Sequence, residues 1–448
     1  MTTRPLIPSV PTRTDGPFSA AYAQLESREQ AVAPAWLTAL RRAGNAHFCE
    51  LGFPTTDHEE WRFTNVAPIA ALPTHSPEKR EVDRSELERF TFGQMPTYRV
   101  VFIDGSFSTT LSSSELLDEG VEIHSLKTAA QSNLGWVQKH LGQYARADEN
   151  AFVALNTSMM EEGAAIRIKA NQHVKTPIHL LFVSTSNQAG ATTHPRVLIV
   201  AERGSEARIL ESYESLTDGS TLTNAVTEIV MEEASHLEHC RLQQESTSAY
   251  HVGTVHAHQS RSSNLITHSI SMGGRIARVN INPVLDAEGC ECVMNGLYVV
   301  DGDQLVDHHT AIHHAKPRCN SHEFYHGILD GNSQGVFNGK IFVRPDAQKT
   351  DAKQTNRNLL LSDGATIQTK PQLEIFADDV KCTHGATVGQ LQEEAVFYLR
   401  ARGIGKEAAR RMLVHAFASD IINRISIEPV RVELDQIMFD LFERERSA

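Results

Sequence analysis

Nine histidine and cysteine residues crowd one stretch of the sequence, between Asp307 and Gly389. Imidazole and thiolate groups bind transition metals in proteins, and both also act as bases or nucleophiles. We therefore expect the chemistry of this chain to lie in this stretch. The nine residues are His308, His309, His313, His314, Cys319, His322, His326, Cys382 and His384.

The four histidines at positions 308, 309, 313 and 314 suggest a metal site by their density alone. In a strand, however, neighbouring side chains point to opposite faces, so His308 and His309 cannot line one site unless the backbone bends. No HExxH motif accompanies them. The residues alone therefore favour structural positions for these histidines and leave a metal site as the alternative.

Cys382 and His384 form a more specific candidate. Residues two apart in a strand project from one side, with Cβ atoms about 7 Å apart, so a thiolate and an imidazole could serve one soft metal or cluster. A nearby imidazolium can also lower the pKa of a thiol. The residues alone leave open a buried cysteine beside a solvent-facing histidine.

Composition excludes several classes of protein. The 448 residues carry a net charge of -13, whereas nucleic-acid binding requires a basic surface. No run of eighteen apolar residues and no signal-like start is present, so we expect a cytoplasmic protein with no membrane contact. The six cysteines form no CxxC pair and are expected to be reduced. Neither a P-loop nor a GxSxG motif occurs.

The candidate residues must be positioned by a long β-rich region. After Asn156 the sequence is almost entirely short strands rich in β-branched residues, separated by corners. The corners lie roughly 26 to 31 residues apart, which is typical of a solenoid and predicts a flattened β-helix. A β-sandwich is the alternative, but the pattern continues for longer than a sandwich usually does. The corners are Gly204-Ser205, Ala234-Ser235, Ser262-Ser263 and Glu288-Gly289.

Helical patterns flank this region. A proline-rich start precedes a helical pattern from Phe18 to Arg42, which Pro34 should divide into two helices. Residues 54–65 read as a capped helix start with Trp61 and Phe63 packed inward, which we favour over a catalytic use of Glu59 or Glu60. Three helices are expected after Gly389, over residues 390–402, over 406–425 and from 429 onward.

These patterns predict three parts. The first is an N-terminal helical region over residues 1–95, and the second is a β-helix core over residues 96–389 with a helical insertion at about 125–147. The third is a C-terminal helical domain over residues 390–448. The open end of a solenoid exposes backbone and apolar side chains, so terminal helices are natural caps.

Several segments form a long and specific pattern: Phe337-Asn-Gly-Lys, Gln348-Lys-Thr-Asp-Ala-Lys-Gln-Thr-Asn-Arg-Asn, Ile375-Phe-Ala-Asp-Asp-Val-Lys-Cys-Thr-His-Gly and Phe397-Tyr-Leu-Arg-Ala-Arg-Gly-Ile. Together they resemble the SufB/SufD family of iron-sulfur cluster assembly proteins. Within the family the chain is similar to the SufD branch, because Gly385 follows His384 where the SufB branch usually has an acidic residue.

The resemblance implies a mainly β fold, a right-handed parallel β-helix core with helical N- and C-terminal regions. It also implies pairing with SufB through the end of the β-helix and binding of the SufC ATPase to the helices after Gln390. His384 would face a SufB cysteine where a transient iron-sulfur cluster forms, and Cys382 would be the neighbouring thiol, either a ligand or structural. The four histidines from His308 to His314 would be core or rim residues. A reduced flavin in the complex and a homodimer of the isolated chain are left open.

Three functions compete at this point. The first is a non-catalytic scaffold subunit of the Suf complex, in which SufC hydrolyses ATP and His384 with Cys382 contacts the nascent cluster. The second is a metal-dependent β-helix hydrolase or lyase acting on a polysaccharide, although no stretch groups the carboxylates and basic residues that such a groove needs. The third is a plain interaction solenoid, which would tolerate replacement of both residues.

Overall fold

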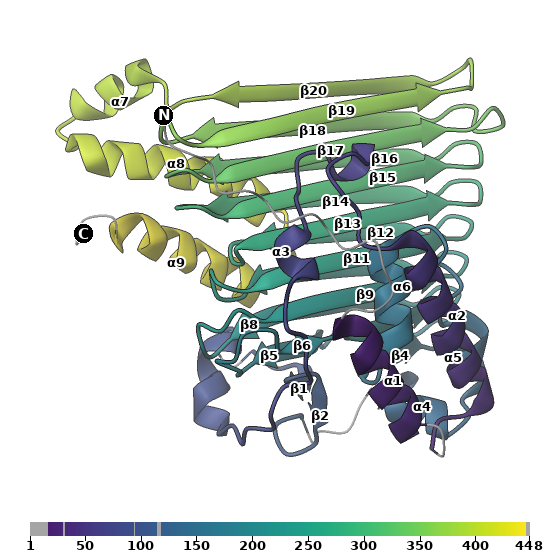
Figure 1. Cartoon of the computed structure of the whole chain (residues 1–448). Helices are drawn as coiled ribbons and strands as arrows, with labels where there is room; N and C mark the ends of the chain where they lie inside the picture. Colours follow the sequence, from purple (N-terminus) through teal and green to yellow (C-terminus); the bar gives the residue numbers. More distant parts are fainter. Residues whose placement is uncertain (1–16, 30–31, 94, 114–117, 445–448) are drawn as a thin grey trace.

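The computed structural model describes residues 17–29, 32–93, 95–113 and 118–444. Two long sheets stack face to face in this part of the chain and form one flattened solenoid (Figure 1). The first sheet has the order β2-β1-β5-β8-β10-β12-β14-β16-β18-β20, and the second has the order β19-β17-β15-β13-β11-β9-β7-β4-β3, with β6 beside β9.

The strands of the first sheet are β1 (Tyr98–Ile103), β2 (Ser106–Ser108), β5 (Ile178–Ser184), β8 (Glu206–Ser215), β10 (His236–Gln244), β12 (Asn264–Ser271), β14 (Glu291–Val300), β16 (Asn320–Leu329), β18 (Asp351–Leu360) and β20 (Lys381–Gly389). Those of the second are β3 (Val121–Ser125), β4 (Gly163–Ile168), β6 (Thr192–Thr193), β7 (Arg196–Ala201), β9 (Leu222–Met231), β11 (Tyr250–Gln259), β13 (Ile276–Leu285), β15 (Leu305–His314), β17 (Gln334–Val343) and β19 (Thr366–Ile375).

From β8 onward each coil contributes one strand to each sheet. Every strand pairs in parallel with the equivalent strand of the next coil, as in the register His236↔Asn264 and Glu291↔Asn320. A sandwich of antiparallel strands does not give this connectivity. The predicted parallel β-helix with helical N- and C-terminal regions is therefore confirmed.

The coils turn at residues whose backbone is left-handed. The predicted corners at Gly204, Ala234, Ser262 and Gly289 all have positive φ, between 54° and 77°. Two further corners, at Arg318 and Lys349, have φ of 57° and 63°. A bulky residue with positive φ is strained, so the ladder on both sides must hold these corners in place.

Apolar side chains fill much of the space between the two sheets. Ile209, Leu265 and Met294 project inward from the first sheet, and Val279 and Ile341 from the second. The middle coils, however, also bury charged and polar groups, among them Glu211, His239 and Arg241. The interior is therefore partly polar, which makes its hydrogen bonding decisive for stability.

Most helices of the N-terminal part cover the outer face of the second sheet (Figure 1), whereas the turn at Arg84–Phe90 packs on β1 and β5 of the first sheet. Pro34 separates the first two, as predicted, although the second continues to Leu51. The proline-rich start lies outside the described residues. The helices are α1 (Pro17–Glu29), α2 (Ala35–Leu51), the 3-10 turn η1 (Glu59–Trp61), α3 (Ala67–Ala70), η2 (Arg84–Phe90), α4 (Leu126–Gln131), α5 (Gly135–His140) and α6 (Ala151–Met159).

The segment around Trp61 differs from its prediction. Only the short turn η1 forms, and its N-cap residue His58 makes no capping hydrogen bond with its side chain. Trp61 is buried as expected, stacked on Phe152 and under Arg278, whose guanidinium carbon lies 3.6 Å from the ring centroid. Phe63 is 43% exposed, because the tight turn sends it to the opposite side.

In the described chain three helices follow the last strand (Figure 1). The second and third pack on the outer face of the first sheet, and the first packs on the second helix. They are α7 (Glu393–Arg400), α8 (Lys406–Ile422) and α9 (Glu428–Arg444). Between α8 and α9, the backbone N–H and the hydroxyl of Ser426 both donate to the carboxylate of Glu238 on β10. None of the described helices is both long and apolar enough to cross a bilayer. The boundaries at residues 95/96 and 389/390 stay a prediction.

A fully buried ion pair fastens the N-terminal helices to the second sheet. The Arg196 Nη2 atom lies 2.6 Å from Oε2 of Glu228, and both side chains have no exposed surface. Glu228 also accepts hydrogen bonds from the backbone N–H groups of Gly142, Tyr144 and Ala145. The pair therefore ties the segment between α5 and α6 to β7 and β9.

Glu228→Gln is expected to lower the free energy of unfolding by about 3 kcal/mol or more, because Arg196 is left buried without a counter-charge. The measurement is equilibrium unfolding in urea at pH 7. The matched control is Glu374→Gln, which removes the partly exposed pair with Lys340 (3.1 Å) and is expected to cost less than about 1 kcal/mol. Equal losses in the two variants would contradict this account.

Candidate functional site

Cys382 and His384 lie on β20, the strand that ends the first sheet. In the register with β18 they stand opposite Ala352 and Gln354. In the described part of the chain no strand pairs with the other edge of β20. The two residues therefore sit at the open end of the β-helix, at the top of Figure 1.

The side chains of the two residues belong to the interior face of the sheet. Cys382 is half-buried and packs against the interior core, and alternation along the strand gives His384 the same side. His384 is nevertheless exposed, because no further coil covers it. The prediction that a thiol and an imidazole share one side is compatible with this arrangement, and their role in chemistry stays a prediction.

The thiol of Cys382 is held in its protonated form. Burial raises its pKa above the usual range, and the charge of Asp351 raises it further. Lys381 is exposed, and alternation sends it to the other face, so it does not counter this effect. A metal ion or a basic partner group would have to displace the thiol proton before the sulfur could act as a ligand.

A buried carboxyl group lies behind His384 on the same interior row. His384 is the register partner of Gln354, and Gln354 is that of Glu323. The Gln354 Nε2 atom donates to Glu323 Oε2 over 2.6 Å. Burial raises the pKa of Glu323 to about 7, so this group changes its charge near neutral pH.

The open end also exposes apolar side chains. On and next to β19, Ile375 and Phe376 are 39% and 56% exposed, and Val388 on β20 is 48% exposed. Backbone N–H and C=O groups along the outer edges of both strands complete this surface. A free sheet edge with apolar neighbours is a template for pairing with another chain.

The cluster of four histidines does not assemble into a metal site. His308 and His314 face the interior, where burial lowers their pKa values to about 3 and about 4. His309 and His313 face outward on the same strand. No group of three or more histidine, cysteine or acidic side chains among the described residues is placed to hold a metal ion. The expectation that these histidines are core or rim residues agrees with this placement.

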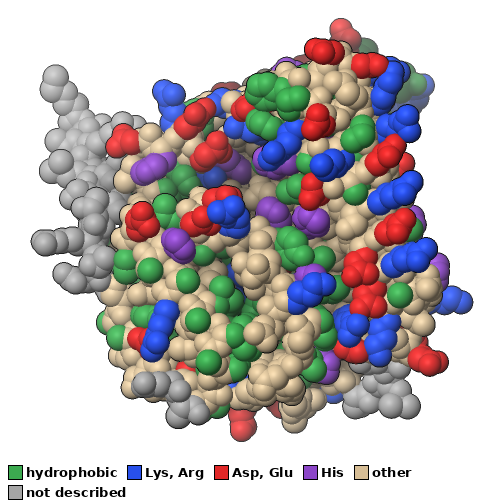
Figure 2. Space-filling view, turned by 90° about the vertical axis from the view of Figure 1, so that its right-hand side faces the viewer, with side chains coloured by type: hydrophobic (Ala, Val, Ile, Leu, Met, Phe, Trp, Pro, Cys, Tyr) green, Lys and Arg blue, Asp and Glu red, His purple; other side chains and the backbone are tan. Residues whose placement is uncertain are grey.

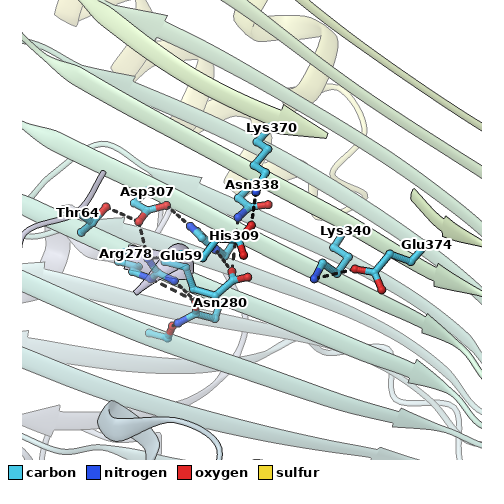
Figure 3. A network of polar contacts seen from close by, with 12 residues as sticks. Glu59, Thr64, Arg278, Asn280, Asp307, His309, Asn338, Lys340, Lys370 and Glu374 are labelled. Atoms are coloured by element: carbon cyan, nitrogen blue, oxygen red, sulfur yellow. Dashed lines mark hydrogen bonds and ion pairs between the residues drawn. The ribbon is translucent and has the colours of Figure 1, made fainter. Parts of the chain in front are cut away.

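A chamber of about 690 Å³ lies against the outer face of the second sheet. Its walls are β15, β17 and β19 on one side and the segment from Thr56 to Phe63 on the other. Figure 3 shows the polar side chains that cross between these two walls. No sequence motif predicts this site, because its two walls come from segments about 250 residues or more apart.

His309 is the centre of the network in the chamber. Its Nε2 atom lies 3.0 Å from Oδ1 of Asp307, and its Nδ1 atom lies 3.1 Å from Oε2 of Glu60. Arg278 adds a contact of 2.7 Å to Oδ2 of Asp307 and donates to the backbone carbonyl of Glu60 over 2.6 Å. The N-terminal segment is thus bound to the β-helix through one imidazole and one guanidinium group.

The network keeps its carboxyl groups ionised. The hydrogen bond from His309 holds the pKa of Glu60 below its usual value, against the effect of burial. Burial alone would raise the pKa of Asp307, but Arg278 and His309 outweigh it and lower that pKa. The carboxylates of Asp307 and Glu60 are paired with Arg278 and His309 within the network. Such pairing is typical of a structural contact between two segments rather than of a general acid or base.

The chamber does not fit a flavin. Its lining carries four carboxylates, from Asp57, Glu59, Glu60 and Asp307, and the cations Arg62 and Lys370. Lys370 is already paired with Glu59 over 2.5 Å. A phosphate-bearing cofactor would meet a net negative surface there.

The buried carboxyl of Glu323 generates a pH prediction. The pKa of Glu323 in the folded chain, about 7, lies above the ordinary value of 4.5. The protonated carboxyl therefore contributes fully to the free energy of unfolding below pH 4.5, and this contribution is lost as the pH rises through 7. Glu323→Gln removes this loss. The unfolding free energy of the variant relative to the native chain should therefore rise by about 3 kcal/mol between pH 4.5 and pH 8.

Urea unfolding at several pH values measures this difference. Glu374→Gln, at an exposed position, should show no such rise. A Glu323→Gln difference that stays flat with pH would show that the Glu323 carboxyl does not titrate in this range.

Comparisons with known proteins match most of the described chain, up to residue 417. Residues 182–417 match the model of the SUF system FeS cluster assembly, SufBD core domain, and residues 14–180 match that of the SufBD protein N-terminal region. The chain is 33% identical over 394 residues to the iron-sulfur cluster assembly SufBD family protein slr0076 of Synechocystis sp., covering 86% of this chain and 87% of that protein.

Two relatives bear the name iron-sulfur cluster assembly protein SufD. The protein of Escherichia coli is 31% identical over 86% of this chain and 88% of its own length. That of Bacillus subtilis is 27% identical over 90% of this chain and 94% of its own length. With both family models matched along one parallel β-helix, the chain belongs to the SufB/SufD family of iron-sulfur cluster assembly proteins.

Proposed function

We propose that this chain is a non-catalytic scaffold subunit of a Suf complex, in which a nascent iron-sulfur cluster forms between the open end of its β-helix and SufB. One observation supports this most strongly: His384 and Cys382 lie together on the last strand, β20, whose outer edge is unpaired in the described structure. The candidate ligands and the pairing surface therefore coincide.

The number of ligands supports a shared site. Iron-sulfur clusters are usually held by four protein ligands, mostly thiolates. The open end offers one thiol and one imidazole, and no larger group of donors is formed within the described residues. The remaining ligands would come from SufB, and the cluster is cargo of the pair rather than a resident cofactor of this chain.

The C-terminal helices offer a separate docking surface. Phe397 and Tyr398 on α7 are 71% and 57% exposed, and Met412 on α8 is 51% exposed. α8 already buries its other face against the first sheet, and α7 packs on α8. We assign this exposed side to SufC, which would hydrolyse ATP and move the helices relative to the open end. The proposal places the complex in the cytoplasm.

The free edge could also accept a second copy of this chain when SufB is absent. Such a homodimer would use the same strands, β19 and β20, so the two states exclude each other. A polysaccharide hydrolase or lyase gains no support from the structure, since neither outward histidine is free. His309 is paired with Glu60, and His313 packs against Phe342.

Val388→Lys is expected to weaken binding to SufB at least tenfold, about 1.4 kcal/mol or more, because the ammonium group would be buried in the interface. Pull-down with SufB and SufC measures this, and SufC binding should be retained. Leu51→Lys, at the end of α2 and 42% exposed in the native chain, is the matched control and should leave both partners bound. Unchanged SufB binding in Val388→Lys would remove β20 from the interface.

His384→Ala is expected to slow cluster formation on the purified complex at least about tenfold, because a ligand of the nascent cluster is lost. Iron and sulfide reconstitution followed by visible absorption measures the rate. Thr383→Ala is the matched control, since Thr383 neighbours His384 but points to the opposite face. Cys382→Ser separates a ligand role, which gives the same loss, from a packing role, which does not.

The complex must be intact for this test to count. Size-exclusion chromatography should show that His384→Ala still assembles with SufB and SufC, since the side chain is exposed and stabilises no coil. A variant that assembles and forms clusters at the native rate would favour a plain interaction solenoid.

A further inference from the structure

The coil corners that precede the first sheet carry a column of small polar side chains. Each left-handed corner residue is followed by a buried serine, cysteine or threonine, which immediately precedes a strand. Most of these side chains donate to the carbonyl three residues earlier, as Ser235 does to Glu232 over 2.8 Å and Ser263 does to Ser260 over 2.7 Å. The column is Ser205, Ser235, Ser263, Cys290, Cys319 and Thr350.

Two neighbouring members of the column are cysteines, and the second of them, Cys319, departs from the pattern of hydrogen bonds. Cys290 donates from Sγ to the carbonyl of Ala287, three residues earlier, over 3.1 Å. Cys319 does not use the carbonyl of Lys316. Its Sγ atom instead reaches the same Ala287 oxygen in the coil below, also over 3.1 Å. Both sulfur atoms therefore converge on one oxygen.

The two thiols are neighbours in successive coils, since each Sγ atom lies 3.1 Å from the same Ala287 oxygen. Each thiol acts on the pKa of the other as a hydrogen-bond partner. The backbone N–H of Asn320 donates to the carbonyl of Cys290 over 2.9 Å, so the strand ladder continues into this corner and fixes the two residues as register neighbours. Adjacent strands lie about 4.8 Å apart, which falls within the range of Cα separations that a disulfide can bridge.

We propose that Cys290 and Cys319 form a redox-active dithiol that a peroxide closes into a disulfide between two successive coils. Ser235 and Ser263 show that a hydroxyl group meets the structural need at this position, so packing alone does not call for sulfur in two consecutive coils. The proposed disulfide would join coils that the backbone ladder already aligns, and its formation requires no movement of the strands.

The chemistry balances with one peroxide molecule. The sulfur of Cys290 attacks one peroxide oxygen, the O–O bond breaks, and a sulfenic acid and water form. The sulfur of Cys319 then displaces the sulfenic hydroxyl, which leaves as a second water with the thiol proton. Two thiols lose two electrons in total, and hydrogen peroxide is reduced to two molecules of water.

The electrostatics assign the order of these steps. The hydrogen bond from Cys319 lowers the pKa of Cys290, which favours its thiolate, while the pKa of Cys319 is raised. By contrast, burial raises the pKa values of Cys240 and Cys292, each to well above the usual range. Those two residues are internal controls for thiols that are buried and unreactive.

The pair is buried beneath an exposed corner of the surface. Arg318, next to Cys319, and Glu288, two residues before Cys290, form an exposed ion pair of 2.9 Å across the two corners. These corners belong to the face seen in Figure 2, where basic and acidic side chains are interspersed along the stacked coils. Access therefore requires displacement of one corner loop and leaves the strands in place.

The test uses the full chain with Cys49→Ser, which removes the one exposed cysteine among the described residues and leaves five of the six thiols. After treatment with hydrogen peroxide, free thiols are alkylated in denaturant and the peptides are mapped by mass spectrometry. We expect a linked peptide that joins residues 290 and 319, a fall from five free thiols to three, and full recovery with dithiothreitol.

Further variants in the same background establish the roles. Cys290→Ser keeps the hydroxyl pattern of the column and should abolish the linked peptide, whereas Cys240→Ser should leave it unchanged. In Cys319→Ser, dimedone should trap a sulfenic acid at Cys290. A folded, peroxide-treated chain in which residues 290 and 319 remain free thiols, or are oxidised singly without a link, would overturn the proposal.

Discussion

The backbone ladder between successive coils is the interaction on which the rest of this structure depends. Each strand is held by the equivalent strands before and after it, so every coil is stabilised by two neighbours except at the ends of the stack. The last coil must leave one edge of β19 and one of β20 without a partner inside the described chain. The same constraint that builds a long rigid body therefore creates its binding surface.

The ladder also explains how polar groups are tolerated in the interior. Because the register is exact from coil to coil, side chains form rows, and a carboxyl such as Glu323 always faces the same neighbours, here Gln354. Fixed rows allow a buried group to keep a shifted pKa without a local rearrangement. The row that contains Glu323 ends at His384, so one row of side chains runs from the interior to the open end.

Patterns that repeat locally could be predicted from the sequence, and contacts between distant segments could not. The corners at Gly204, Ala234 and Ser262 recur with the coil length, and their backbone conformation is a property of a few consecutive residues. The contact between Glu60 and His309 joins residues 249 apart and leaves no periodic signal.

Local rules favoured a capped helix at Glu59, but the burial of Trp61 under Arg278 decided the conformation of that segment. The exposure of His384 followed only once β20 was seen to be the last strand.

The C-terminal helices have a consequence for the synthesis of the chain. They cover an apolar band on the outer face of the first sheet, which includes Leu242, Ile270, Leu297 and Ile328, and they leave the ribosome after the strands that they cover. A nascent or truncated chain that stops at Gly389 has a complete stack of coils with this band in water. Such a product would be a substrate for chaperones and proteases, although its β-helix could already be formed.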